Sequence, residues 1–213
     1  MLEPTILIGS PLIFNNKIKI YPPTVREVVA NPNFGVFYKI LTFTQEDVKD
    51  EVKGKLQEGE PTPTPFEYLL INCAYANGFF VLLQGAFALF CRSKVKFDLG
   101  SKKLWFCDLE DKEENWRLLE EEEFFDFQNK VRVVMGDKPV PPPLPEDPNE
   151  DPRIRRIKEK ARERDRIKAK QGTKGGISLS TCLAAICCMG IGLTPLNIGE
   201  MSYASVGELM RMM

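Results

Sequence analysis

Short runs of alternating apolar and polar residues open the chain. TILIG and KIKIY have the composition of β-strands, and Asn15-Asn16, between LIF and KIKI, suits a tight turn that needs a positive φ. Farther along, KVKFD-LGSK-KLWFCDL alternates in the same way and reverses at a glycine, which predicts a β-hairpin. The pattern therefore predicts small antiparallel β-structures at two places in the N-terminal half.

Between these runs, the pattern changes to that of helices. Residues 34–43, FGVFYKILTF, are so apolar over so short a run that helix and buried strand both remain open. Residues 77–91, NGFFVLLQGAFALFC, are apolar nearly all round and predict a helix through the middle of the domain. Three further helix starts are marked by a threonine with an acid three residues later, the capping-box pattern: Thr24 with Glu27, Thr44 with Asp47, and Thr64 with Glu67.

One more helix is predicted over LLEEEEFFDFQNKVRVVMG. It places Leu118, Phe125, Phe127 and Val131 among charged residues and ends at Gly136. Its four consecutive glutamates lie in the first turns, where the helix dipole favours anions. Residues 1–136 are therefore expected to form an α+β domain.

The next two segments are strongly polar. Residues 137–152 form a predicted linker, because Pro139 to Pro152 holds seven prolines and four acids. A spacer fits this composition better than an SH3-type ligand, since LPEDPNEDP has no basic residue. Residues 153–171 are expected to form a charged helix with only a thin apolar stripe, which suits docking rather than a core.

Residues 172–213 are expected to form a small helical domain after a glycine joint. The sequence predicts an apolar helix, ISLSTCLAAICCMGIG, then a turn, and a last helix capped by Ser202 or Ser205. A membrane span over residues 177–193 is a weaker alternative, because the stretch is short and contains serines and glycines.

Composition narrows the possible chemistry. The chain has no histidine, which removes Ser-His and Cys-His hydrolytic arrangements and histidine metal sites. Six cysteines without a C-x-x-C pair lie mostly among apolar neighbours and predict buried, reduced thiols. There is no phosphate-binding glycine loop and no G-x-S-x-G motif. We therefore expect no enzyme, no catalytic residue, no metal and no cofactor.

The net charge of −1 conceals two segments of opposite charge, one acidic and one basic. Residues 108–126 hold ten acids and two bases, and residues 153–170 hold ten bases and three acids. Such blocks either attract each other or a charged partner, or form two solvated faces. The basic run is a candidate electrostatic spacer or nucleic-acid contact, but it has no aromatic residue, Asn or Gln for base recognition. Five arginines of this run are the candidate residues for the spacer or binding role: Arg153, Arg155, Arg156, Arg162 and Arg166.

With an enzyme not expected, an interaction protein is the class that remains. The C-terminal residues offer a candidate surface for binding another protein. Apolar side chains crowd there, and methionine adapts to irregular apolar partners. These side chains either pack the small helical unit itself or bind a partner. A unit of this size should struggle to bury them all alone, which favours a partner, either another protein or the N-terminal domain. The candidate partner-binding residues are Leu193, Pro195, Leu196, Ile198, Met201, Leu209 and Met210.

The order of segments resembles that of tail assembly chaperones from long-tailed phages of Gram-positive bacteria. The similar parts are the opening GSP-hydrophobic-x-N with IYPPTVREV, the acidic helix ending in FQNKVRVV, the charged run RIRRIKEKARER, an apolar helix, and the closing GLTPLNIGEMSYASVGELM. This family commonly ends in a longer charged tail, whereas the present sequence stops at Met213.

The resemblance implies a globular α+β domain linked to a small helical domain. It further implies a non-enzymatic chaperone of the host cytoplasm that binds the tape measure protein, with the tail tube protein and self-association as further contacts. Linked modules would gain avidity for a long apolar client. A phage nucleic-acid-binding protein that uses residues 153–170 and a structural component of the tail are the alternatives.

Overall fold

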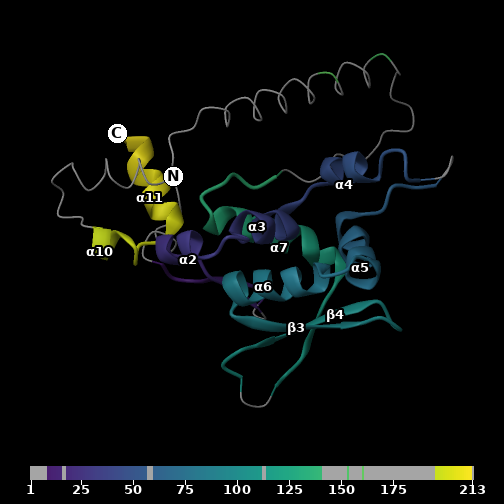
Figure 1. Ribbon diagram of the computed structural model, residues 1–213, viewed down its shortest axis with the longest axis horizontal. Coiled ribbons are helices and arrows are strands. Elements are labelled where there is room, and N and C mark those ends of the chain that lie inside the picture. The colour runs from purple at the N-terminus through teal and green to yellow at the C-terminus, as the bar shows by residue number, and fades with distance from the viewer. Residues whose placement is uncertain are drawn as a thin grey trace. The chain divides into compact units, whose positions relative to one another are not determined.

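The computed structural model describes residues 9–15, 18–56, 60–111, 114–140, 153, 160 and 195–212. Residues 1–139 and 194–213 form one compact unit, and residues 140–193 form a second. The helices and strands named below lie in the first unit (Figure 1). They combine helices with two small antiparallel sheets, so the predicted α+β class is confirmed.

The first sheet is the predicted N-terminal hairpin. Strands β1 (Leu12–Phe14) and β2 (Ile18–Ile20) pair antiparallel, with Leu12 opposite Ile20. Asn15 has a φ of 48°, which confirms the expected left-handed turn residue. Side chains alternate along both strands between buried and exposed, so one face of the hairpin covers the core. In the TILIG run, residues 5–8 lie outside the described residues.

The three capping boxes are confirmed. They precede α2 (Val25–Ala30), α4 (Gln45–Val52) and α5 (Pro65–Tyr75). In each, the threonine side chain accepts a hydrogen bond from the main chain three residues on, and the acid there accepts one from the threonine main chain. This reciprocal pair satisfies two N–H groups that a helix start would otherwise leave without partners.

Two apolar helices form the centre of the unit. Residues 34–43, for which strand and helix were both open, contain α3 (Phe34–Thr42), whose buried residues recur at three- and four-residue steps. The expected central helix is α6 (Phe79–Cys91), and Figure 1 shows it between α3 and α7 on one side and the β3–β4 strands on the other. It is not buried all round, because Val81 and Gln84 are exposed.

The second sheet has one strand more than the sequence predicted. Its order is β3 (Ser93–Asp98), β4 (Lys103–Asp108) and β5 (Arg117–Leu119), all antiparallel neighbours. The sequence placed Leu118 in a helix, and this was wrong. In β5 it lies opposite Trp105, while the next residue, Leu119, is buried opposite Leu104. Pairing with β4 overrides the helical preference of the following glutamates.

The acidic helix α7 (Glu121–Val134) starts directly after this strand. Glu120 is its N-cap and the next three glutamates occupy the first turn, as expected. The turn at Gly136, with a φ of 82°, confirms the predicted end. Phe127 is fully buried and stacks on Phe87 of α6, with ring centroids 5.5 Å apart. Phe125, which was expected on the apolar face, is only half-buried.

The C-terminal residues belong to the first unit. Helices α10 (Pro195–Ile198) and α11 (Tyr203–Met212) lie in the same compact unit as residues 1–139, although the sequence suggested a separate domain over residues 172–213. Ser202 accepts a hydrogen bond from the Ser205 main chain at 3.2 Å and is therefore one of the two expected caps. Residues 172–194 lie outside the described residues.

Three cysteines are described, and all are free. Cys91 and Cys107 are buried, as expected, and Cys73 is half-buried. The remaining cysteines, Cys182, Cys187 and Cys188, lie outside the described residues, as does the stretch 177–193 that was weighed as a membrane span. In the described part of the chain, every helix is too short or too polar to cross a membrane.

Candidate functional site

The N-terminal end of α2 is completed by residues from the other end of the chain. The first N–H groups of a helix have no partner within it. The Thr24 hydroxyl accepts from Glu27 N, while Val25 N donates to the carbonyl of Met201 and Arg26 N to that of Gly199, both at 3.0 Å. Two of the free donors of α2 are therefore satisfied by carbonyl groups from residues 199–201.

The contact continues through the main chain beyond these two bonds. Tyr203 N donates to the Pro23 carbonyl at 2.8 Å, and Thr24 and Ser202 form an antiparallel β-bridge. We call residues 23–26 together with Phe34 the α2 surface, and residues 195–212 the C-terminal segment. The two are held together largely by main-chain pairing, which depends on backbone position more than on side-chain identity.

Side chains close this contact. Ala204 and Val206 are 2% and 1% exposed, and Ile198 is also buried. The Tyr203 ring lies against Phe34, with centroids 6.1 Å apart. At the rim, Arg26 forms an ion pair with Glu200 at 2.6 Å, but both side chains are more than half exposed, so the pair adds little stability. The C-terminal segment is therefore held by buried apolar side chains as well as by main-chain hydrogen bonds.

Glu27 connects this contact to the core helix α6. Its carboxylate accepts from the Thr24 main chain at 2.8 Å and from the guanidinium of Arg92, which ends α6 in a left-handed conformation. Arg92 also lies over the Tyr21 ring, 5.7 Å from its centroid. Partial burial by itself would raise the pKa of Glu27, but the hydrogen bonds from Thr24 and Arg92 outweigh it and lower that pKa. Glu27 is therefore held ionised.

The predicted partner-binding residues fall into three groups in the structure. Ile198 is buried, so it anchors the segment and is not free to hold another protein. Met201 and Leu209 are half-buried and remain partly accessible. Leu193 and the side chains of Pro195, Leu196 and Met210 lie outside the described residues.

The basic run is described at two positions only. Arg153 and Lys160 are helical and exposed. Arg155, Arg156, Arg162 and Arg166 lie outside the described residues, as do residues 141–152 of the predicted linker. The function of the basic run as a spacer or binding element stays a prediction.

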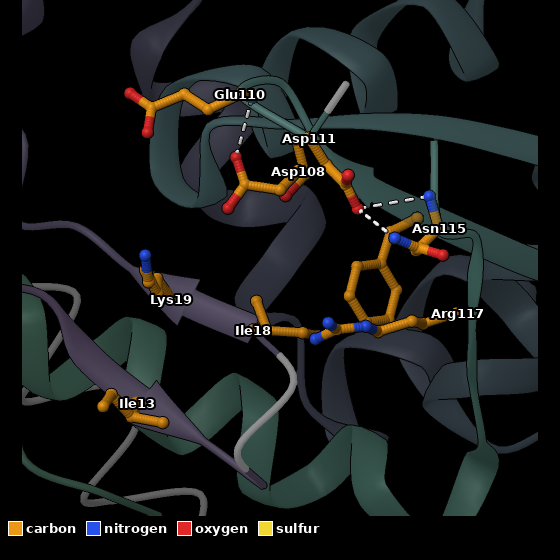
Figure 2. Close-up of a pocket in the computed structure, with 10 residues that line it drawn as sticks. Ile13, Ile18, Lys19, Asp108, Glu110, Asp111, Asn115 and Arg117 are labelled. Carbon is orange, nitrogen blue, oxygen red and sulfur yellow. Dashed lines mark hydrogen bonds between the residues drawn. The ribbon is translucent and has the colours of Figure 1, made fainter. Parts of the chain in front are cut away.

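A cavity of about 460 Å³ lies between the two sheets (Figure 2). Ile13, Ile18 and Lys19 line it from the N-terminal hairpin. The second sheet contributes Ser93, Phe106, Asp108 and Arg117, and the loop between β4 and β5 contributes Glu110, Asp111 and Asn115. Nothing in the sequence indicates this cavity, because its two walls are far apart along the chain.

Several polar groups that line this cavity are hydrogen-bonded to residues close to them in the sequence. Asp108 accepts from Glu110 N at 3.0 Å, and Asp111 accepts from the Asn115 side chain at 3.0 Å. The Ser93 hydroxyl donates to the Cys91 carbonyl at 2.9 Å. Among the described residues, no group of three or more carboxylates or thiols is placed to hold a metal ion. We assign no reaction to the cavity.

Comparison with protein-family models, with curated proteins and with solved structures finds no match to this chain. The α2 surface and the cavity are therefore assessed by their geometry alone. Of the two, the α2 surface is the stronger candidate, because it already binds a peptide segment through defined hydrogen bonds.

Proposed function

We propose that this chain is a non-enzymatic tail assembly chaperone of a phage, acting in the host cytoplasm. Its client is the tape measure protein, which it keeps soluble while the tail is assembled. The order of segments supports this proposal: an α+β domain, a proline-rich and acidic stretch, a basic run, and a closing GLTPLNIGEMSYASVGELM.

The observation that carries the proposal is the way in which the C-terminal segment is anchored. Ile198, Ala204 and Val206 are buried, whereas Met201 and Leu209 remain half-buried. The segment thus presents adaptable apolar side chains on a base that is fixed by main-chain hydrogen bonds. Such a surface can accept varied apolar helices without first being ordered, which lowers the entropic cost of binding.

The proposal can be tested by co-expression of the full chain with the tape measure protein encoded near it. We expect the client to stay soluble and to co-purify with the chain. Met201→Ser with Leu209→Ser should reduce the co-purified client severalfold, because both changes remove apolar contact area. Leu99→Ser is the matched control, since Leu99 is an exposed leucine in the β3–β4 turn, outside the C-terminal segment.

Two results would overturn the proposal. In the first, the client precipitates with the full chain, and nucleic acid that is released by high salt co-purifies instead, which would make the basic run the working site. In the second, the Leu99 control lowers client recovery as much as the double variant, which would mean that the C-terminal segment is not the holding surface.

A further inference from the structure

The α2 surface has the features of a binding site for one kind of peptide. It offers two N–H donors, those of Val25 and Arg26, which require carbonyl acceptors 3.0 Å away. It offers the Phe34 ring to an aromatic side chain and the Arg26 guanidinium to a carboxylate. The C-terminal segment matches all of these groups, with Gly199, Glu200, Met201 and Tyr203 in the corresponding positions.

The C-terminal segment is connected to residues 1–139 by a stretch that belongs to another compact unit. Residues 140–193 separate residue 139 from residue 194, and this stretch clusters by itself. Most of the buried core is supplied by elements that precede residue 139, and the C-terminal segment adds Ala204. The segment can therefore leave the surface while the elements of the core keep their own contacts.

We propose that the α2 surface also binds the C-terminal segment of a second copy of this chain, so that two copies exchange their segments. A reciprocal exchange reproduces every contact between the segment and the surface. The gain in contact energy is then the same in one chain and in the exchanged pair. What differs is whether the segment and the surface belong to the same chain. Tethering within one chain favours the closed form at low concentration, and the exchanged pair forms at high concentration.

A second copy is the occupant that the observations favour. The acceptor carbonyls, the glutamate opposite Arg26 and the tyrosine opposite Phe34 all belong to the sequence of this chain. The inference does not depend on the chaperone function, because it concerns only the contact between residues 23–34 and 199–206. An exchange that fails while the contact within one chain still forms would therefore leave the proposed client binding untouched.

The test uses two full-length variants, Arg26→Cys and Glu200→Cys, which carry tags of different size. Both side chains are more than half exposed, so neither change should disturb folding. The variants are mixed at a series of concentrations, equilibrated, and treated briefly with a short bismaleimide. Lys96→Cys replaces Arg26→Cys in the matched control, because Lys96 is exposed on β3 outside the α2 surface. The double variant Arg26→Cys with Glu200→Cys reports the contact within one chain.

We expect a cross-linked product that contains both tags, with a fraction that rises about tenfold for a tenfold rise in concentration while the pair is scarce. The Lys96 mixture should stay at the level of the chain without added cysteines. The proposal is overturned if the two-tag product never exceeds that level while the double variant cross-links within one chain. Failure of the double variant to cross-link would also overturn it, since the contact itself would then not form.

Discussion

The side-chain amide of Gln128 on α7 donates a hydrogen bond to the main-chain carbonyl of Phe43, 2.9 Å away and 85 residues earlier in the sequence. Phe43 ends α3, where the last carbonyl groups have no partner within the helix. Arg132, one turn farther along α7, donates to the carbonyl of Thr42. Side chains of α7 therefore cap the end of α3 and fix the two helices together.

Gln128→Ala should destabilise the protein by about 1–3 kcal/mol, because it leaves the buried Phe43 carbonyl without a donor. Urea unfolding followed by fluorescence measures this loss. Gln84→Ala is the matched control, since Gln84 is an exposed glutamine on α6, and its effect should stay within about 0.5 kcal/mol. Equal losses from the two changes would mean that the bond to Phe43 contributes nothing beyond helix propensity.

Gly85→Ala should destabilise the protein although alanine favours helices. A Cβ at position 85 of α6 would lie 2.5 Å from Cζ of Phe37 on α3, so the buried Phe37 ring or the two helices would have to shift. Overpacking of this kind costs about 1–3 kcal/mol, more than the roughly 1 kcal/mol that alanine gains over glycine. Thermal unfolding should show a lower midpoint.

Gly35→Ala provides the comparison for this change. Gly35 lies in α3 with nothing within 4 Å of a Cβ built there, so the substitution should raise stability by up to about 1 kcal/mol. A stabilising Gly85→Ala would contradict the close approach of α3 and α6.

The lowered pKa of Glu27 makes stability depend on pH in the acid range. A group with a lower pKa in the folded state stabilises the fold above its unfolded value of 4.5, and this contribution is lost as the pH falls through the folded pKa. Glu27→Gln should cost about 1 kcal/mol at pH 7, where the bond to Arg92 is charge-assisted. The difference from the unaltered chain should shrink below pH 4.5.

Unfolding in urea at several pH values measures this difference. Glu46→Gln, which changes an exposed glutamate in the first turn of α4, is the control for the loss of one surface charge. A constant difference between the Glu27 variant and the unaltered chain from pH 7 to pH 3 would show that Glu27 is not the group that titrates.

Thiol labelling should distinguish the folded from the unfolded state. Burial raises the pKa of Cys73 to about 12, so at pH 8 only ~1 in 10⁴ of these thiols is ionised. Burial also raises the pKa of Cys91, which lies at the end of α6. We expect iodoacetamide to modify both slowly in the folded protein and rapidly in urea, as followed by peptide mass spectrometry. Rapid labelling of Cys91 under native conditions would contradict its burial.

Local signals in the sequence predicted the elements that depend on local chemistry. Each capping box needs a threonine and an acid three residues apart, and each one formed. The turn at Asn15 and the end of α7 at Gly136 needed residues that tolerate a positive φ, and both are visible in the sequence.

Features that depend on distant pairing were not predictable in this way. β5 exists because β4 offers a free edge, and nothing in WRLLEEEE distinguishes it from the start of a helix. The contact between residues 23–26 and 199–203 is made largely by main-chain groups. Every residue carries a main-chain carbonyl, and every residue except proline carries an N–H, so these groups leave no mark in the sequence. The sequence favoured a partner for the C-terminal apolar residues, but it did not indicate which surface would provide it.

The compact unit that contains α2 and α11 is discontinuous in sequence, so in topological terms residues 140–193 are an insertion within it. The entropic cost of closing an inserted stretch rises only with the logarithm of its length, by about 0.6 kcal/mol for each doubling. The length of this stretch can therefore change greatly at little cost to the unit. Proteolytic cleavage inside it would turn the contact between residues 23–26 and 199–203 into an association of two fragments, whose extent would depend on their concentration.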